Sequence, residues 1–299
     1  MPHVTTNGIQ ICYESYGDAS APTVLMIMGL GGQLTMWSDE LIDNLVADGY
    51  RVISFDNRDI GLSHHHTGEK SPAILKQILL GRIGIKLKTP YKLSDMATDT
   101  IGLLDALKLD RVHLVGISMG GMIAQHVSAM VPERVQSLTA IMTTTGNPKL
   151  PRPSGKVMKA MVRRGPPPTT RDAIIDQSVA TFEVIGTPGE NQNTNGMRDR
   201  ITRSYDRSYN PAGLARQMSA IAASGDFRKF TRAIKAPTLV LHGSEDPLVP
   251  IEGGRDVAKL VHGARMEVLD GMGHDVPPRF LSQITKHMLD HFAATKVNH

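Results

Sequence analysis

A serine between glycines is the strongest chemical signal in the sequence. Gly116–Gly120 (GISMG) follows an apolar segment, Val112–Val115, and precedes a helical pattern. A serine hydroxyl is a poor nucleophile unless it is exposed, held in place and next to a base. A sharp turn from strand to helix exposes Ser118, and Gly116 and Gly120 tolerate the crowding of such a turn. The pattern predicts that Ser118 is a nucleophile; a glycine-rich turn that only packs a helix on a strand is the alternative.

A carboxylate follows Ser118 at a position that suits a catalytic acid. Thr238–Leu241 is typical of a buried strand, and Asp246 lies in the turn shortly after it. The carboxyl ends of parallel strands are where ligands bind in open α/β folds. Glu245 is the rival for this role, but Pro247 fixes the chain directly after Asp246 and favours a firmly held aspartate. We therefore expect Asp246 to be the acid.

The expected base is His274, which follows both residues in the chain order that such a site needs. It ends the glycine-containing segment Gly271–His274, after the expected strand Arg265–Leu269, and glycines let such a loop pass close to a nucleophile. His274 would take the proton of the Ser118 hydroxyl and later give it to a leaving alcohol, while Asp246 holds the imidazole. Structural roles are expected for other histidines, namely His113, His287 and His291.

Two backbone N–H groups are expected to stabilise the negative oxygen that forms when Ser118 attacks a carbonyl group. One belongs to Met119, the residue after the nucleophile, and the other to Leu30 in the glycine-rich segment Met28–Gly32. The helix that begins at Met119 also directs its N-terminus toward this oxygen. A plain turn is the alternative explanation for the glycines of Met28–Gly32.

No cofactor, metal or nucleic acid is expected as a partner. The sequence contains no G-x-G-x-x-G segment that opens a helix with an acid beyond it, and no phosphate-binding G-K-[ST] segment. His64–His66 could indicate a metal site, but no partner ligands are spaced to complete one. The net charge is +4, yet aromatic residues make up only 4% and are not interleaved with the basic ones, as nucleic-acid binding would favour.

The composition bounds the class of protein and its compartment. The 299 residues are 40% hydrophobic and 21% charged, which is ordinary for a soluble globular chain. Met1–Gln10 does not resemble a signal peptide, and no apolar stretch approaches the roughly 18–20 residues of a membrane span. Cys12 is the single cysteine, so no disulfide can form within the chain. We expect a cytoplasmic protein without stable membrane insertion; whether it forms a homo-oligomer stays open.

Strand and helix patterns alternate along the first and last parts of the chain. A hairpin is expected around Asn7 and Gly8, a favoured tight-turn pair. The expected strands are Thr23–Met28, Arg51–Phe55, Val112–Ile117, Val135–Met142, Thr238–Leu241 and Arg265–Leu269, and the expected helices are Asp39–Ala47, Leu93–Leu107, Met119–Val131, Gly254–Val261 and Pro278–Ala294. This alternation predicts an α/β fold with a mostly parallel central sheet and helices on both faces.

The alternation stops between residues 143 and 230. This segment is irregular and rich in proline, and four helices are expected in it: Gly155–Arg163, Asp172–Ile185, Met197–Arg203 and Ala212–Ala223. We expect an insertion over the sheet, with residues 1–142 and 231–299 as the core. Residues 144–235 carry 16 Lys and Arg against 7 Asp and Glu. A solvated basic face is the plain interpretation, and attraction of anionic substrates or surfaces is the functional one.

Together these residues resemble the α/β-hydrolase family over nearly the whole chain outside 143–230. The chain is most similar to the carboxylesterases and methylesterases related to aclacinomycin methylesterase. This similarity rests on Gly29–Gly32 with Trp37 shortly after it, on Phe55–Ser63 (FDNRDIGLS) and on Gly116–Gly120. The resemblance implies that the insertion is a helical cap covering an active site.

Two positions depart from the pattern of many family members. Those members have His-Gly where this chain has Met28 and Gly29. The methionine leaves the backbone N–H donor of this segment available, but it cannot make the supporting hydrogen bond that a histidine side chain could make. Many also have glycine in place of Asp59, although the methylesterase branch is similar to the form found here. The resemblance further implies that Asp56 and Arg58 are structural and tie down the loop after their strand.

These expectations combine into a serine hydrolase that cleaves small to medium carboxylic esters through an acyl-enzyme at Ser118. The same residues would serve a lactonase, a C–C bond hydrolase or a cofactor-free perhydrolase or haloperoxidase, because fold does not fix function. Epoxide hydrolases and haloalkane dehalogenases of this fold use aspartate as the nucleophile, so Ser118 argues against both. A receptor-like member that only binds a ligand is the non-enzymatic alternative.

Apolar side chains in the insertion predict an acyl-binding pocket. They are Met158, Met161, Val162, Phe182, Val184, Ile185, Leu214 and Met218. Packing of the insertion on the sheet explains them at least as well. The sequence identifies neither the natural ester nor the acyl length.

Overall fold

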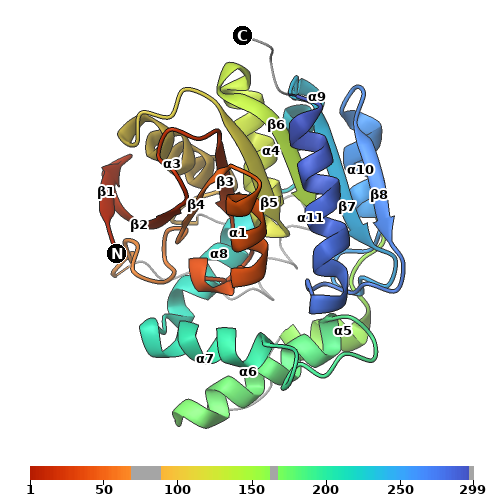
Figure 1. Cartoon of the computed structure of the whole chain (residues 1–299). Coiled ribbons are helices and arrows are strands. Elements are labelled where there is room, and N and C mark those ends of the chain that lie inside the picture. Colours follow the sequence, from red (N-terminus) through yellow and green to blue (C-terminus); the bar gives the residue numbers. More distant parts are fainter. Residues whose placement is uncertain (69–88, 162–167, 296–299) are drawn as a thin grey trace.

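A mostly parallel sheet forms the centre of the molecule (Figure 1). The computed structural model describes residues 1–68, 89–161 and 168–295. Within them, eight strands pair in the order β1-β2-β4-β3-β5-β6-β7-β8. The strands are β1 (His3–Thr6), β2 (Ile9–Tyr16), β3 (Thr23–Ile27), β4 (Arg51–Phe55), β5 (Val112–Ile117), β6 (Val135–Ile141), β7 (Thr238–Gly243) and β8 (Arg265–Leu269). β2 pairs antiparallel with both β1 and β4, and every pair from β4 to β8 is parallel.

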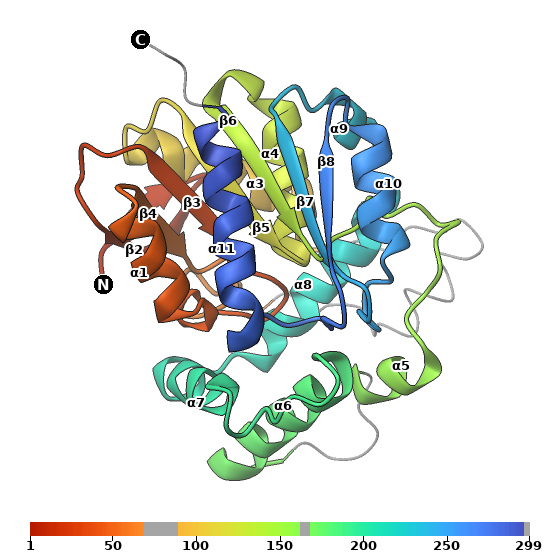
Figure 2. The same cartoon turned by 45° about the vertical axis from the view of Figure 1, so that its right-hand side comes forward.

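Helices cover both faces of this sheet, as the sequence predicts (Figure 2). α1 (Asp39–Ala47) and α11 (Pro278–Ala293) pack on one face. On the other lie α3 (Leu93–Ala106), α4 (Met119–Met130) and α10 (Glu252–Leu260). The predicted α/β fold with a mostly parallel sheet is confirmed.

β3 shows why a central strand of this sheet is almost entirely apolar. Val24 and Met26 belong to the core on the α1 and α11 face, whereas Leu25 and Ile27 belong to the core on the α4 face. Successive side chains of a strand point to opposite faces, so a strand covered on both sides needs apolar residues at every position.

The chain between β6 and β7 forms a separate helical layer. In its described part the helices are α5 (Gly155–Met161), α6 (Arg171–Ile185), α7 (Met197–Arg207), α8 (Pro211–Ser224) and α9 (Arg228–Ala233). α5, α6 and α7 lie beyond the carboxyl edge of the sheet, and α8 runs back toward the core (Figures 1 and 2). We call residues 143–230 the insertion; its boundary at 230 falls within α9, which packs on α4 and is not among the expected helices.

Most element bounds follow the sequence pattern, and α7 is the clearest exception. α7 continues four residues beyond the expected Arg203, to Arg207. Tyr205 packs against the apolar cluster that joins α6 to α7, and Arg207 contacts Asp56. These contacts with distant segments hold the last turn of a helix that its polar sequence alone does not predict.

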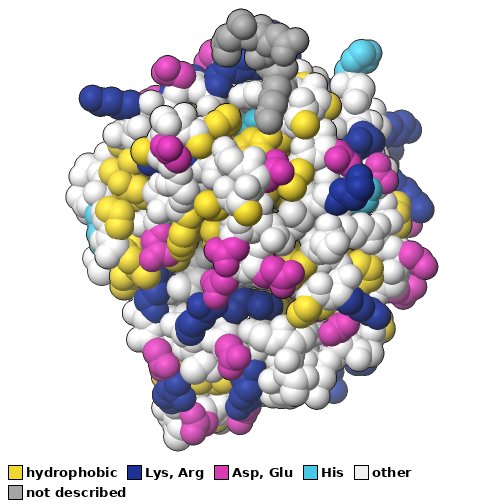
Figure 3. All heavy atoms as spheres, in the orientation of Figure 1, with side chains coloured by type: hydrophobic (Ala, Val, Ile, Leu, Met, Phe, Trp, Pro, Cys, Tyr) yellow, Lys and Arg dark blue, Asp and Glu magenta, His cyan; other side chains and the backbone are white. Residues whose placement is uncertain are grey.

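The basic surplus of the insertion is partly neutralised in the folded chain. On the face in Figure 3, basic and acidic side chains alternate over the insertion. Four arginines form ion pairs at the surface of the insertion: Arg171 with Asp206, Arg198 with Asp176, Arg203 with Asp39 and Arg228 with Asp226. No helix in the described ranges is long and apolar enough to cross a bilayer.

A buried ion pair ties the segment after β4 to α3. Arg58 donates from Nε and Nη2 to the two carboxylate oxygens of Asp99, at 2.5 and 2.6 Å. Both side chains are buried. Such a pair is costly to desolvate, but losing one partner is worse, because it leaves an uncompensated buried charge.

Two further buried pairs connect this segment to the insertion. Asp56 contacts Arg207 at 2.6 Å, and Asp59 contacts Arg216 of α8 at 2.7 Å. Asp59 has a φ of 72°, in the left-handed region where glycine is favoured and aspartate is tolerated. Burial raises the pKa of Asp59, but hydrogen bonds from Arg216 and Tyr91 outweigh it and lower the pKa overall. These contacts explain how aspartate is held in a backbone conformation that favours glycine.

We expect Asp99→Asn to lower the free energy of unfolding by about 3 kcal/mol, because Arg58 then stays buried without its carboxylate. Asp105→Asn is the matched control on the same helix. It breaks an exposed pair with Arg134 and should change the free energy by less than about 1 kcal/mol. Denaturant unfolding followed by circular dichroism measures both, and equally small changes would show that the buried pair does not hold the fold.

Candidate active site

Ser118 lies in the turn between β5 and α4, in a backbone conformation that few residues adopt. Its φ is 54° and its ψ is −117°. Such a conformation costs about 1–3 kcal/mol and persists only where the surroundings enforce it. The Ser118 N–H donates to the Ile141 carbonyl at 2.9 Å, and the Ser118 carbonyl accepts from Thr143 Oγ1 at 2.8 Å. The neighbouring strand β6 and the residues after it therefore fix the turn.

The glycines on either side of Ser118 lie where no side chain fits. A Cβ atom on Gly120 would be 2.0 Å from the carbonyl oxygen of Ile27, and one on Gly116 would be 2.4 Å from the carbonyl oxygen of Gly120. Both obstacles are backbone atoms, which cannot rotate away. α4 thus approaches the ends of β3 and β5 more closely than any other residue type allows.

Ser118, His274 and Asp246 form one hydrogen-bonded chain. Ser118 Oγ is 2.9 Å from His274 Nε2, and His274 Nδ1 is 2.6 Å from Asp246 Oδ2. A carboxylate only accepts, so we assign the imidazole proton to Nδ1, which leaves the Nε2 lone pair facing the serine hydroxyl. The turns after β5, β7 and β8 bring these residues together, although 156 positions separate Ser118 from His274.

Asp246 is oriented by backbone groups of its own turn. Its Oδ1 accepts from the N–H groups of Leu248 at 3.0 Å and Val249 at 2.8 Å, while Oδ2 faces His274. Asp246 is buried, whereas the rival Glu245 is exposed. The carboxylate that contacts the histidine is therefore that of Asp246.

A second histidine, His242, lies fully buried beside Asp246, and no sequence pattern singled it out. Its Nε2 is 2.8 Å from the Val249 carbonyl oxygen and 3.6 Å from Asp246 Oδ2. Burial lowers the pKa of His242, which favours the neutral imidazole, and we assign its proton to Nε2 because the Val249 carbonyl can only accept. A neutral neighbour leaves the negative charge of Asp246 available to His274.

The segment after β3 lies against Ser118. A Cβ atom on Gly29 would be 3.3 Å from the Cβ of Ser118. Leu30 follows directly, and Met119 begins α4, where the first N–H groups have no acceptor within the helix. Leu30 and Met119, the two predicted backbone donors, thus lie on the two segments that meet at Ser118.

Two side chains outside the sequence prediction hold this segment. Asn57 donates from Nδ2 to the Met28 carbonyl at 3.0 Å. Gln217 of α8 accepts from the Gly31 N–H and donates to the Arg58 carbonyl, both at 2.9 Å, and it is fully buried. In the sequence, Gln217 stands out only as a polar residue within the apolar pattern of α8. That pattern alone does not show whether the Gln217 side chain is buried or exposed.

Two of the predicted pocket residues lie next to this site. The Ile185 carbonyl accepts from the His274 N–H at 2.8 Å, and a Cβ atom on Gly31 would be 2.7 Å from Leu214 Cδ1. Four others are partly buried: Met158, Phe182, Val184 and Met218. Val162 and the side chain of Met161 lie outside the described residues.

The histidine run makes local contacts. His65 Nε2 is 2.9 Å from the Gly61 carbonyl oxygen, and the His66 ring stacks on Tyr91. Across residues 1–68, 89–161 and 168–295, no three His, Cys, Asp or Glu side chains are grouped as metal ligands.

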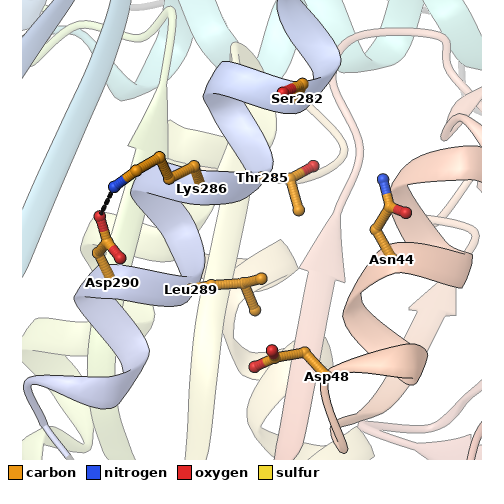
Figure 4. Close-up of a pocket in the computed structure, with 7 residues that line it drawn as sticks. All are labelled: Asn44, Asp48, Ser282, Thr285, Lys286, Leu289 and Asp290. Atoms are coloured by element: carbon orange, nitrogen blue, oxygen red, sulfur yellow. Dashed lines mark hydrogen bonds and ion pairs between the residues drawn. The ribbon is translucent and has the colours of Figure 1, made fainter.

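A surface depression lies outside this site, between α1 and α11 (Figure 4). Its lining residues are Asn44, Asp48, Ser282, Thr285, Lys286, Leu289 and Asp290. Most are polar, and Lys286 is paired with Asp290 one turn along α11. None of them belongs to the hydrogen-bonded chain of Ser118.

Comparison with known proteins gives matches along most of the chain. The model of a family described as alpha/beta hydrolase fold matches residues 22–277. The rhodomycin D methylesterase DnrP of Streptomyces peucetius is 24% identical over 293 residues, covering 92% of this chain and 92% of that protein. The 3-oxoadipate enol-lactonase 2 of Acinetobacter baylyi is 26% identical, covering 89% of this chain and 87% of that protein. The predicted similarity to methylesterases is confirmed.

Solved structures give the same architecture. A meta-cleavage product hydrolase from Pseudomonas fluorescens IP01 superposes with a TM-score of 0.76, covering 99% of this chain and 98% of that one. The two sequences are 17% identical, so this likeness concerns the fold alone.

We expect Gly120→Ala to reduce the reaction of Ser118 with a fluorophosphonate by about a hundredfold or more, because the new Cβ collides with the Ile27 carbonyl and displaces the turn. Gly155→Ala in α5 is the matched control, since the added methyl group meets no atom within 4 Å. Intact-protein mass spectrometry over time measures the labelling. A Gly120→Ala protein that labels as fast as the wild type would contradict the role of close packing.

Acid is expected to destabilise the fold through buried histidines. Burial lowers the pKa of His126, His242 and His291 below the ordinary value of 6.5. Below that pH the unfolded chain binds more protons than the folded chain, so stability decreases as the pH falls. One such histidine removes up to about 1.4 kcal/mol per pH unit until its folded pKa is reached. Denaturant unfolding across this range measures the slope, which His242→Gln should reduce; an unchanged slope would rule out its contribution.

Proposed function

The chain belongs to the alpha/beta hydrolase fold family, and on this premise we propose that it is a serine esterase acting on small to medium carboxylic esters. One observation carries the proposal: the hydrogen-bonded chain from Ser118 Oγ through the His274 imidazole to Asp246. A nucleophile, a base in contact with it and a carboxylate that orients the base are the parts that acyl transfer requires. The names of the methylesterase and enol-lactonase relatives agree with this chemistry.

In the first half of the cycle, Ser118 Oγ attacks the ester carbonyl carbon while its proton moves to His274 Nε2. Asp246 stabilises the resulting imidazolium. The carbonyl oxygen becomes an oxyanion, which accepts hydrogen bonds from the N–H groups of Leu30 and Met119. When this intermediate collapses, the C–O bond to the alcohol breaks, His274 protonates the alcohol, and the acyl group stays on Ser118.

In the second half, a water molecule replaces the alcohol. His274 takes a proton from this water, whose oxygen attacks the acyl carbon. Collapse of the second oxyanion breaks the bond to Ser118 Oγ, returns the proton to the serine and releases the carboxylic acid. Each step uses groups that the chain supplies, so we include no cofactor or metal.

In this proposal the ester carries apolar groups, because two of the predicted pocket residues, Leu214 and Ile185, lie next to the site. Leu214 lies against Gly31, and Ile185 contacts His274 through its backbone. In this proposal α5 to α8 form a cap that shapes the acyl pocket in a cytoplasmic enzyme; the single cysteine, Cys12, suits a reducing compartment. The methylesterase relative makes methyl esters the first alcohol group to test.

A lactonase is the second candidate, and the enol-lactonase relative favours it. A lactone is an internal ester, so the same two half-cycles open the ring without releasing a separate alcohol. A C–C bond hydrolase and a cofactor-free perhydrolase or haloperoxidase would use the same three side chains. A receptor-like protein would bind a ligand without turnover, and an activated Ser118 argues against it.

We expect the wild type to hydrolyse p-nitrophenyl esters in a series from acetate to palmitate, with a preferred acyl length that reports the depth of the pocket. Ser118→Ala should lose about a thousandfold or more of this activity, because the nucleophile is absent. Ser128→Ala is the matched control: Ser128 is also buried in α4, and its hydroxyl has no hydrogen-bond partner among the described residues.

The outcomes separate the candidates. Full activity in Ser118→Ala would overturn the assignment of the nucleophile. Rapid fluorophosphonate labelling of Ser118 without turnover of any ester would move the proposal to lactone, C–C bond or perhydrolase chemistry. If Ser118 is not labelled and no ester is turned over, the receptor-like alternative is favoured.

A further inference from the structure

The loop that carries His274 is bonded to the insertion at three consecutive residues. The Gly273 N–H donates to Thr187 Oγ1 at 2.9 Å, and the His274 N–H donates to the Ile185 carbonyl at 2.8 Å. Asp275 then accepts two hydrogen bonds from Thr187, from its N–H at 2.8 Å and from its Oγ1 at 2.5 Å. Thr187 follows the end of α6, so a residue of the insertion contacts the loop on both sides of the histidine.

The Thr187 hydroxyl both donates and accepts a hydrogen bond in this arrangement. It donates its single proton to Asp275 and accepts the Gly273 N–H. The other carboxylate oxygen of Asp275 accepts from Gln192 Nε2 at 2.9 Å. Thr187, Gln192 and Asp275 are each at most 3% exposed. In such a dry cluster each hydrogen bond is strong, and removing one partner leaves a buried polar group unsatisfied.

Close backbone packing fixes the same place. A Cβ atom on Gly273 would be 2.3 Å from the carbonyl oxygen of Gly186, so the two glycines touch backbone to backbone. The earlier part of the loop is held differently, by the core. Gly271 donates to Ser244 Oγ, and Met272 contacts Leu269 and Glu245 through backbone hydrogen bonds. The insertion therefore supplies the hydrogen bonds at the residues closest to the imidazole.

The direction of the His274 side chain depends on this backbone. Its imidazole is hydrogen-bonded to Asp246 and to Ser118, and both bonds are needed at once for proton transfer. A shift of the Gly273–Asp275 backbone would lengthen one of them, and catalytic constellations lose activity steeply with displacements of about 1 Å.

We propose that Thr187 is a positioning residue. Through the Thr187 hydroxyl, the insertion fixes the orientation of the His274 imidazole between Ser118 and Asp246. The Thr187 hydroxyl is bonded to Gly273 and Asp275 rather than to Ser118 or the His274 imidazole, so it acts through the backbone of His274. The insertion is then part of the proton-transfer machinery as well as a cover. This inference rests on the proposed function only in using Ser118 and His274 as the reacting pair.

Thr187→Val tests it, because valine keeps the shape and removes the hydroxyl. We expect the second-order rate of fluorophosphonate labelling at Ser118, and kcat on the best ester, to fall about 10- to 100-fold with KM within about twofold. Thr187→Ser keeps the hydroxyl and should stay within about threefold of the wild type. Gln192→Leu is the matched control, since it breaks an equally buried bond to Asp275 but leaves the Thr187–Gly273 contact.

A second measurement reads the histidine directly. In proton NMR, the Nδ1 proton that His274 shares with Asp246 should give a low-field resonance in the wild type and in Thr187→Ser, and a shifted or exchange-broadened one in Thr187→Val. Labelling within twofold of the wild type and an unchanged resonance in Thr187→Val would overturn the inference, as would an equal loss in Gln192→Leu. If Thr187→Val does not fold, Thr187→Ala replaces it, and the same results support or overturn the inference. A wild type that resists labelling but keeps the Thr187-dependent resonance would contradict the proposed function and leave the positioning role intact.

Discussion

The close approach of α4 to the ends of β3 and β5 is the constraint on which the rest of the site depends. Gly116 and Gly120 allow it, because any Cβ atom at these positions would meet backbone. The approach forces Ser118 into a left-handed conformation at the turn, and strand β6 holds it there. The hydroxyl is then placed at the carboxyl edge of the sheet, where the turns after β7 and β8 deliver the acid and the histidine. The strained turn at Ser118 thus places its hydroxyl beside the acid and the histidine, which come from distant segments of the chain.

Short-range signals made much of this predictable from the sequence. Apolar runs followed by small or acidic residues located the turns of Ser118, Asp246 and His274, because a strand end and a tight turn are encoded within about ten residues. The bounds of α1, β4, β5 and β8 agree with the expected ranges for the same reason.

The contacts that hold the site from outside were not predictable in this way. Gln217 and Gly31 are 186 positions apart, and Thr187 and Asp275 are 88 apart. Threonine and glutamine are mostly exposed in folded proteins, so their type and spacing do not indicate a buried contact with a distant segment. The length of α7 beyond Arg203 is a further example, since tertiary contacts rather than helix propensity hold its last turn.

Buried polar contacts attach the insertion to the core, in addition to the apolar ones. Asp56 with Arg207, Asp59 with Arg216, and Asp275 with Thr187 join segments before and after the insertion to its helices. Apolar surfaces tolerate sliding, whereas hydrogen-bonded charges in a dry interface are satisfied in one arrangement. The insertion is therefore fixed in register with the loops that carry the reacting groups.

The pair formed by Asp59 and Arg216 also has a consequence for substitution at either position. Glycine suits the φ of 72° at position 59 at least as well as aspartate does, so backbone strain does not prevent the exchange. Yet glycine alone would strip Arg216 of both carboxylate oxygens that it binds. The two positions, 157 residues apart, are thus energetically coupled, and the effect of an exchange at position 59 on stability depends on the residue at position 216.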